Sequence, residues 1–233
     1  MTYTRRLKWD SDFFGYEIGR ADIVNVNQFD VEKFKSESSK YKLVYVFSKE
    51  KISLEPFALV DEKVVFRKDN IDLLVPQPSG NRIVSFDRGR HDEQQMIDLA
   101  LESGKYSRFN VDPNFQKNEY SRLYTEWILN SINGKLAFDV IVALANQQIL
   151  GFTTIAKIDD DLADIGLVAV HPDARGRGVG TELIYAAIER ARLANFKSIQ
   201  VVTQSENIPA CSLYRKAEFT VNDITHIYHY WNS

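Results

Sequence analysis

The stretch Ile165-Gly-Leu-Val-Ala-Val-His-Pro-Asp-Ala-Arg-Gly-Arg-Gly-Val-Gly180 decides how the chain around it folds. It begins with the apolar, β-branched residues of a buried strand and runs through a glycine-rich loop. From Gly178 to Asn195, apolar residues then recur at helical spacing. Glycine lets the backbone approach a ligand closely, and the first amides of a helix lack partners within it. The order of strand, loop and helix therefore predicts an anion site that suits a pyrophosphate.

Two common nucleotide-binding motifs do not fit this loop. A P-loop requires Gly-Lys-Ser/Thr, but Gly180 is followed by Thr181 and Glu182. A dinucleotide fingerprint requires G-x-G-x-x-G, whereas the glycines stand at 176, 178 and 180. ATP, GTP and NAD are disfavoured. An isolated G-x-G-x-G can also be a plain surface turn, but the strand before it and the helix after it favour a ligand site.

The segments around the loop predict an α/β fold with a mixed, mostly antiparallel central sheet flanked by helices. Apolar runs separated by short polar turns predict three consecutive antiparallel strands, at 138–144, 149–158 and 165–170. The strand predicted at 198–203 follows a crossover helix, which implies parallel pairing. Apolar residues at helical spacing predict further helices at 93–101 and 119–132.

The N-terminal part of the chain predicts a separate small α/β lobe. Residues 75–81 combine two prolines, a serine and a glycine, and we therefore expect a linker there and a domain boundary near residue 80. The predicted domains are residues 1–80 and 81–233. The lobe has one predicted helix, at 31–38, and short predicted strands at 16–24, 43–47, 64–66 and 73–75.

Composition limits the classes of partner and compartment. The 233 residues carry a net charge of −3, which gives no electrostatic reason to expect nucleic acid as a partner. The single cysteine, Cys211, favours a reducing compartment. The first 20 residues are charged throughout and no segment reaches transmembrane length, so the sequence predicts a cytoplasmic protein without a membrane partner.

These motifs resemble the GNAT superfamily of N-acetyltransferases, whose loop pattern is Arg/Gln-x-x-Gly-x-Gly/Ala. Residues 175–180, Arg-Gly-Arg-Gly-Val-Gly, match that pattern, and residues 168–173 resemble the family's preceding strand and turn. Residues 207–219, from Asn207 through Tyr214, resemble a later family motif. One departure is Glu218, where many members carry glycine.

The resemblance implies a GNAT fold and acetyl-CoA as the acetyl donor, with no metal. Asn207 would steady the amide arm of the donor, and Tyr214 would protonate the departing thiolate. The pantetheine arm would pair like an added strand with the backbone of Leu167, Val168, Ala169 and Val170. The pyrophosphate would be held by backbone amides in the loop and helix start, namely Arg175, Gly176, Arg177, Gly178, Val179, Gly180 and Thr181.

Each of these roles has a plainer alternative. Tyr214 can be a packing aromatic, and Asn207 can be an ordinary N-cap ahead of Pro209, a role compatible with ligand contact. His226 and His229 are three residues apart in a predicted strand, where they face opposite sides and make a poor metal pair. Direct attack of a bound amine on the thioester requires no enzyme nucleophile, so we expect a sequential reaction.

A closer resemblance concerns the acceptor. The chain is similar to superfamily members that acetylate the 4-amino group of a dTDP-linked amino-deoxy sugar, at residues 9–15, 107–109, 124–128 and 202–204. This implies a nucleotide-linked amino sugar as the partner and an acceptor role for the N-terminal lobe. Arg108 is then a candidate contact for the sugar nucleotide, although its loop can also simply anchor two helices.

Several alternatives remain for the acceptor and the assembly. The same catalytic core can acetylate a protein N-terminus, a polyamine or an antibiotic, because neither fold nor donor fixes the acceptor. A non-catalytic acyl-CoA sensor is a further alternative. The final predicted strand, at 226–231, would allow a homodimer if it paired with a second copy.

Overall fold

The structure is a computed structural model that describes residues 4–53, 55–71 and 82–232. The chain divides into two compact units: a small unit of Met1–Val64 with Asp223–Ser233, and a large unit of Val65–Asn222. The boundary expected near residue 80 therefore lies at Val64, and the C-terminal strand joins the small unit instead of the large one. The cause is that two long strands, β4 (Ala58–Asp69) and β10 (Thr220–Trp231), each contribute to both units. The predicted linker at 75–81 and the predicted strand at 73–75 lie outside the described residues.

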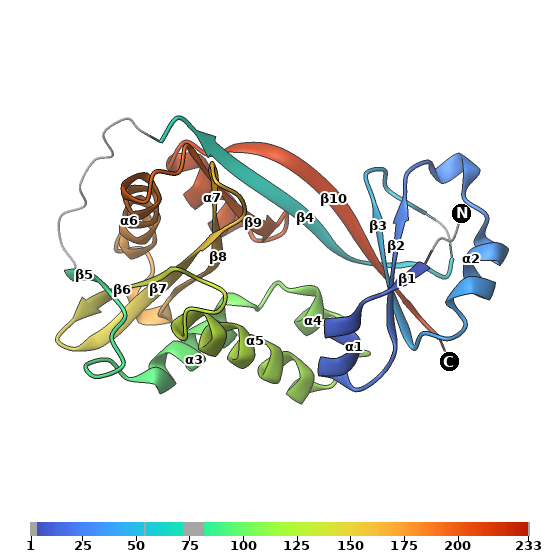
Figure 1. Cartoon of the computed structure of the whole chain (residues 1–233), viewed down its shortest axis with the longest axis horizontal. Helices are drawn as coiled ribbons and strands as arrows, with labels where there is room; N and C mark the ends of the chain where they lie inside the picture. Colours follow the sequence, from blue (N-terminus) through green and yellow to red (C-terminus); the bar gives the residue numbers. More distant parts are fainter. Residues whose placement is uncertain (1–3, 54, 72–81, 233) are drawn as a thin grey trace. The chain divides into compact units, whose positions relative to one another are not determined.

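The small unit is the predicted α/β lobe (Figure 1). Its helices are α1 (Lys8–Phe14) and α2 (Val31–Ser38), with a short 3₁₀ turn, η1 (Val26–Gln28). Its strands are β1 (Thr4–Arg6), β2 (Ile18–Ile23), β3 (Leu43–Ser48), the first part of β4 and the C-terminal part of β10. The β2 and β3 strands are parallel, and the β1–β2 and β3–β10 pairs are antiparallel. One face of this sheet packs on α2 through a buried cluster that includes Phe34, Val44, Val46 and Tyr228.

The final strand does not offer a free edge for a dimer. Residues His226–Trp231 of β10 pair with β3 along their whole length, and β4 is the other neighbour of β10 in the strand order. A strand with neighbours on both sides has no unpaired edge to lend to a second copy. The fold therefore gives no support to a dimer formed through this strand, and the homodimer stays a prediction.

The large unit confirms the predicted meander and crossover. Its consecutive antiparallel strands are β5 (Arg82–Ser85), β6 (Asp139–Ala145), β7 (Gln148–Lys157) and β8 (Leu162–Val170). The strand β9 (Ser198–Gln204) pairs parallel with β8 after the helix α6 (Val179–Leu193). The other helices are α3 (Glu93–Ser103), α4 (Arg108–Val111), α5 (Lys117–Ile132) and α7 (Ile208–Lys216), and η2 (Pro172–Ala174) is a 3₁₀ turn.

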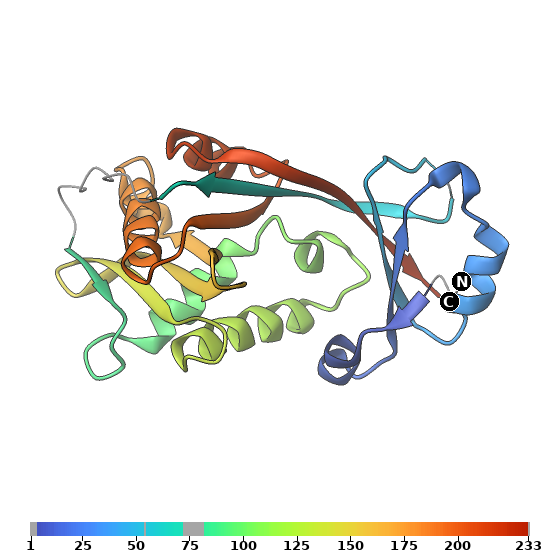
Figure 2. The same cartoon turned by 45° about the horizontal axis from the view of Figure 1, so that its top comes forward.

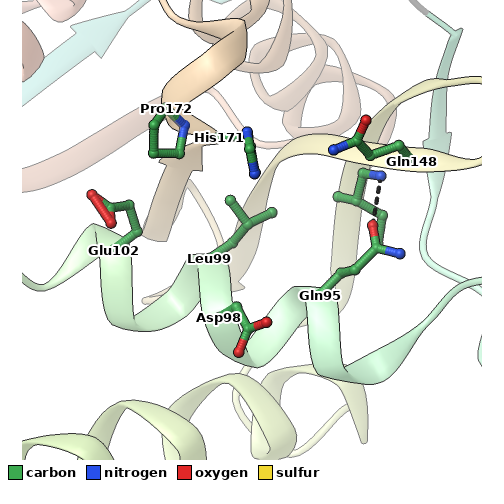
Figure 3. A pocket seen from close by; sticks show the side chains of 8 residues that line it. Gln95, Asp98, Leu99, Glu102, Gln148, His171 and Pro172 are labelled. Carbon is green, nitrogen blue, oxygen red and sulfur yellow. Dashed lines mark hydrogen bonds between the residues drawn. The ribbon is translucent and has the colours of Figure 1, made fainter.

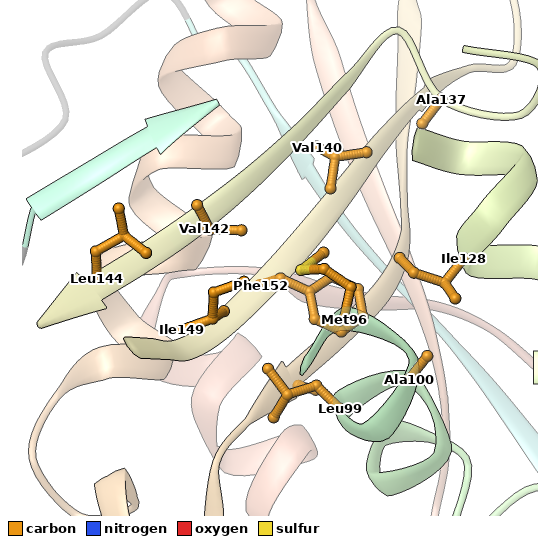
Figure 4. Packing of buried hydrophobic residues seen from close by; sticks show 11 residues of the cluster. Met96, Leu99, Ala100, Ile128, Ala137, Val140, Val142, Leu144, Ile149 and Phe152 are labelled. Atoms are coloured by element: carbon orange, nitrogen blue, oxygen red, sulfur yellow. The ribbon is translucent and has the colours of Figure 1, made fainter. Parts of the chain in front are cut away.

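Helices cover both faces of this sheet (Figures 1 and 2). On one face, Phe152 of β7 joins a buried cluster with Met96 of α3 and Ile128 of α5 (Figure 4). On the other face, a Cβ at Gly151 would lie 3.1 Å from Leu183 of α6. Neighbouring strand residues face opposite sides, so β7 is buried between two helical layers. This packing fixes the position of β8, the next strand along the sheet.

Candidate active site

One edge of β8 is left open in its second half. Its parallel pairing with β9 runs from Leu162↔Ser198 to Ile165↔Val201. Among the described residues, no further pair between β8 and β9 follows. Its antiparallel pairing with β7 continues to Val170. Residues 166–170 therefore present backbone hydrogen-bonding groups on the side away from β7. An extended ligand can pair with such an edge like an added strand.

A β-bulge in β8 coincides with the point where β8 and β9 separate. Two residues of β8, Gly166 and Leu167, lie opposite the single residue Thr154 of β7, because the paired positions on either side are Thr153↔Val168 and Ile155↔Ile165. The Leu167 amide donates to the Thr154 hydroxyl at 2.9 Å. A bulge bends its strand, and here it turns β8 at the residue that follows its last pair with β9.

The bulge determines which residues expected to bind the donor can do so. The amides of Leu167 and His171 both point to β7, the latter donating to the Leu150 carbonyl at 2.8 Å. Successive residues of a strand alternate in direction, so Ala169 also points to β7, and Val168 and Val170 face the open edge. Of the four backbone positions expected to contact pantetheine, Leu167 and Ala169 are engaged with β7. Val168 and Val170 remain suited to that role.

The loop after β8 has the backbone geometry expected of the predicted anion cradle. Gly176 and Gly178 adopt positive φ angles of 74° and 84°, which other residues rarely tolerate, and a Cβ at either position would meet open space. The first hydrogen bond of α6 runs from the Glu182 amide to the Gly178 carbonyl at 3.0 Å. The amides of Val179, Gly180 and Thr181 precede this bond and have no acceptor within the helix. An anion fits here, because Gly178 caps the helix without a side chain.

Gly180 has a different role from the other two glycines. A Cβ at this position would lie 3.2 Å from Leu213 of α7 and 3.5 Å from Val170 of β8. The residue is a glycine because three elements converge on it: the start of α6, the end of β8 and the middle of α7. The absence of a side chain at Gly180 therefore lets α7, the helix that carries Tyr214, pack closely against the start of α6.

Arg175 is occupied by the protein itself. Its amide, expected among the phosphate-binding amides, donates to the Pro172 carbonyl at 3.2 Å in the η2 turn. Its guanidinium donates to the Val170 carbonyl at 3.2 Å and to Glu102 of α3 at 3.1 Å. Arg175 is thus a brace that ties the loop to β8 and α3. Arg177, by contrast, is exposed on the loop.

Glu102 is the acidic partner of Arg175, and the sequence does not predict this pairing. Its side chain is only 18% exposed and also forms an ion pair with Lys105. Burial alone would raise the pKa of the Glu102 carboxyl, but the hydrogen bonds from Lys105 and Arg175 bring the pKa below its ordinary value of 4.5. The residue lies more than 70 positions before the loop, and nothing in its sequence surroundings marks it.

The Glu102→Gln variant should be less stable than the wild type at neutral pH but not at acid pH. A carboxyl whose folded-state pKa is depressed stabilises the fold above its ordinary pKa and loses that contribution as the pH falls through the depressed value. Melting temperatures of both proteins from pH 7 to pH 3 test this. The gap should close below about pH 4. A gap that stays constant with pH would show that Glu102 acts through packing and not through its charge.

A cavity of about 340 Å³ lies behind the loop, between α3 and the start of β7 (Figure 3). His171 and Pro172 of the loop line it on one side, and its acidic residues are Asp98 and Glu102. Gln95 of α3 accepts a hydrogen bond from the Ile149 amide of β7 at 2.9 Å. Two carboxylates make this cavity a poor place for a phosphate. The loop and the start of α6 are therefore the better candidate for the predicted anion site.

Asn207 caps α7. Its side-chain oxygen accepts a hydrogen bond from the Ala210 amide at 3.3 Å, and Pro209 stands in the first turn of the helix. The cap fixes the start of the helix that carries Tyr214 seven residues later. The structure therefore contains the capping role that the sequence left as an alternative. A contact of Asn207 with the donor stays a prediction.

Tyr214 is buried in α7, at 4% exposure, between Phe66 of β4 and Phe219. The ring centroids are 5.6 and 6.2 Å away, respectively. Burial raises the pKa of the Tyr214 phenol far above its ordinary value, with a smaller contribution from Cys211. The phenol is therefore protonated at neutral pH, as an ordinary tyrosine is, and the raised pKa by itself does not favour proton transfer.

Arg108 is the first residue of α4, where Ser107 caps the helix by accepting the Phe109 amide at 3.3 Å. Its guanidinium carbon lies 4.4 Å from the centre of the Phe109 ring. The residue thus contributes to the packing of its own loop, and a contact with the acceptor stays a prediction.

The described residues include no helix long and apolar enough to cross a membrane. They also include no group of three His, Cys, Asp or Glu side chains placed to hold a metal ion.

The geometry agrees with a match to a known family. Residues 105–219, which contain the bulge, the cradle, Asn207 and Tyr214, match the family described as the acetyltransferase (GNAT) family. Residues 105–219 are a GNAT acetyltransferase domain. The matched region begins inside the large unit and ends just before β10. The fold class expected from the sequence is thereby confirmed.

Curated relatives of this GNAT domain act in different settings. The Bacillus subtilis spore coat polysaccharide biosynthesis protein SpsD is 29% identical over 140 residues, which cover 60% of this chain and 48% of that protein. The Escherichia coli streptothricin acetyltransferase is 35% identical over 82 residues, covering 35% of this chain and 47% of that protein. The Escherichia coli dTDP-fucosamine acetyltransferase is 31% identical over 119 residues, covering 50% of this chain and 49% of that protein.

A solved structure shares the fold of the GNAT domain. The PaiA N-acetyltransferase of Thermoplasma acidophilum, solved in complex with coenzyme A, superimposes with a TM-score of 0.50 at 16% identity, over 66% of this chain and 99% of that chain. At this identity the similarity concerns the fold alone. The chain spans about half the length of the curated relatives that it matches.

Proposed function

We propose that this protein is an acetyl-CoA-dependent N-acetyltransferase whose acceptor is the amino group of a nucleotide-linked amino sugar. The observation that carries the donor half is the open edge of β8 leading into the anion cradle. An extended amide-containing arm that ends in a pyrophosphate needs both features in this order. Acyl-CoA has that chemistry, whereas the loop lacks the lysine of a P-loop and the spacing of a dinucleotide fold.

The residues divide the work of holding the donor. Val168 turns both its amide and its carbonyl to the open edge, and the carbonyl of Val170 is held by Arg175. The amides of Val179, Gly180 and Thr181, at the positive end of α6, suit the pyrophosphate. Gly176, Gly178 and Arg177 complete the cradle. The single most specific element is the cradle, because it combines two left-handed glycines with a helix start that has no side-chain cap.

Bound acetyl-CoA supplies a thioester whose acetyl group passes to the acceptor amine. The chain's part in that step is to hold a proton at the phenol oxygen of Tyr214 until the thiolate leaves. A phenol carries this proton at neutral pH without any shift of its pKa. Asn207 supports this arrangement by fixing the start of α7. The amine attacks the thioester carbonyl directly and loses one proton to water, solvent returns a proton to Tyr214, and no side chain forms a covalent bond with the acetyl group.

Support for an amino-sugar acceptor comes from the relatives and from the sequence motifs. Two of the relatives are a polysaccharide biosynthesis protein and a dTDP-fucosamine acetyltransferase. A third acts on streptothricin, which favours a small-molecule amine in general. A nucleotide-linked sugar presents a pyrophosphate and flat rings, and we propose that Arg108 and the small unit serve that half of the reaction.

A substrate panel tests the proposal. The purified full chain is incubated with acetyl-CoA and, in separate reactions, dTDP- and UDP-linked amino sugars, streptothricin, a polyamine and an N-terminal peptide. Released thiol and product mass are followed together. We expect thiol release and a mass increase of one acetyl group with an amino-sugar nucleotide. Turnover of another amine alone would overturn the acceptor assignment, and binding of acetyl-CoA without turnover of any amine would indicate an acyl-CoA sensor.

A further inference from the structure

We infer that Thr154 of β7 is a positioning residue for the donor, acting through the backbone of β8. This inference rests on the proposed function, because it assigns Thr154 to the edge that would hold acyl-CoA. The side chain is 2% exposed and its hydroxyl accepts the Leu167 amide at 2.9 Å. No feature of the local sequence marks this threonine, which stands inside an apolar strand.

The Thr154 hydroxyl replaces a hydrogen bond that the bulge removes from the ladder between β7 and β8. Because Gly166 and Leu167 together face one residue of β7, the regular ladder has no carbonyl for the second of them. A side-chain oxygen on the facing residue satisfies the Leu167 amide in its place. Thr154 thus stabilises the bulge from the side opposite to the open edge.

The bulge in turn determines which backbone groups of β8 face its open edge. Before the bulge, β8 pairs regularly with β9 up to Ile165↔Val201. After the bulge, Val168 and Val170 face away from β7, and the described residues of β9 do not pair with them. Without the bulge, each residue beyond it would exchange direction, and Val168 would turn toward β7. The bond from Leu167 to Thr154 therefore helps to set which backbone groups meet the pantetheine arm.

Gly166 shows how closely the two strands approach at this point. A Cβ there would lie 3.0 Å from the Thr154 hydroxyl oxygen, which is tighter than ordinary contact. An alanine at 166 would push on the same oxygen from the β8 side. The Gly166→Ala variant therefore disturbs the contact independently of any change at Thr154.

Thr153, the next residue of β7, provides a matched control. It is fully buried like Thr154, but among the described residues its hydroxyl has no hydrogen-bond partner. The change Thr153→Val removes the same atoms from the same strand without removing a hydrogen bond. Thr154→Val removes the acceptor of the Leu167 amide, and Thr154→Ser keeps it.

The experiment has two readouts that do not depend on turnover. Hydrogen exchange of the Leu167 amide, followed by NMR in the full chain, reports on the bond itself. Calorimetric titration with coenzyme A and with acetyl-CoA reports on the open edge. We expect Thr154→Val to speed Leu167 exchange at least ten-fold and to weaken both ligands by about three- to ten-fold, with Thr154→Ser near the wild type and Thr153→Val unchanged.

The outcomes separate this inference from the proposed function. Wild-type protein that binds neither ligand overturns the proposed function, and this inference with it, whatever the exchange data show. Wild-type binding together with equal affinity in Thr154→Val overturns this inference alone. If Thr154→Val does not fold, Gly166→Ala takes its place. Weaker binding in Gly166→Ala supports the inference, and unchanged binding overturns it.

Discussion

Replacing Tyr214 with phenylalanine is expected to lower kcat by about two to four orders of magnitude, the range for a positioned acid. The affinity for acetyl-CoA should stay within about two-fold, because the ring itself is kept and continues to pack between Phe66 and Phe219. The loss falls on turnover because the variant has no proton to give to the departing thiolate. Single-turnover kinetics beside calorimetric titration separate the two effects.

The pH dependence of the same reaction provides a second check. The raised pKa of Tyr214 implies that the phenol stays protonated well beyond the range in which an ordinary tyrosine ionises, near pH 10. The rate should therefore not fall through loss of this proton up to that pH. An alkaline fall in kcat below pH 9 that disappears in Tyr214→Phe would show that the phenol is not shielded as the structure indicates.

Tyr120 offers a control for the loss of a half-buried phenol. It lies in α5 and its hydroxyl donates to the Leu101 carbonyl. Tyr120→Phe should therefore lower the melting temperature with little change in kcat. If Tyr120→Phe slowed turnover as much as Tyr214→Phe, the effect would reflect loosened packing, and the assignment of Tyr214 as the acid would fail.

The parts of the fold that the sequence predicts well are those fixed by local patterns. The helix predicted at 31–38 is α2 with the same bounds, because Asp30 caps its first turn by accepting the Lys33 amide. The three-strand meander and α6 follow from apolar runs and from helical spacing. The glycine loop is equally local, since positive φ angles require particular residues at particular positions.

The parts that the sequence does not predict depend on contacts between distant segments. The division of the chain at Val64 cannot be read from local patterns, because β10, at the end of the chain, returns to pair with β3. The helix α1 (Lys8–Phe14) was missed because it is short and shows no apolar repeat, although Gly15 ends it at a φ of 81°. The bonds of Thr154 and of Glu102 join residues 13 and 73 positions apart. No spacing rule reaches across such distances.

The site residues show the same difference between features set by local sequence and features set by contacts between distant segments. The positions of Gly176 and Gly178 follow from the sequence, because their role is conformational. The engagement of Leu167 and Arg175 within the protein does not, because it depends on a bulge and on a carboxylate from another helix. A motif therefore identifies the segment that would hold the donor, and the structure is needed to say which of its backbone groups are available.

Replacing Gly178 with alanine is expected to weaken acetyl-CoA binding by about one to two orders of magnitude. A Cβ at 178 would meet no protein atom within 4 Å, so the change causes no internal clash. Instead, a residue with a side chain resists the φ of 84°, at a cost of about 1–2 kcal/mol, and relaxation of that strain would turn the amides of 179–181 away from the ligand. The new methyl group would also occupy the cradle.

Gly134 gives a matched control for the strain. It follows α5 with a φ of 72°, and a Cβ there would also meet open space. Gly134→Ala should therefore lower the melting temperature about as much as Gly178→Ala while leaving the affinity for acetyl-CoA unchanged. Calorimetric titration of both variants decides the matter. If both lost stability and neither lost affinity, the strain at Gly178 would be unconnected with the ligand, and the anion cradle would have to lie elsewhere than at the start of α6.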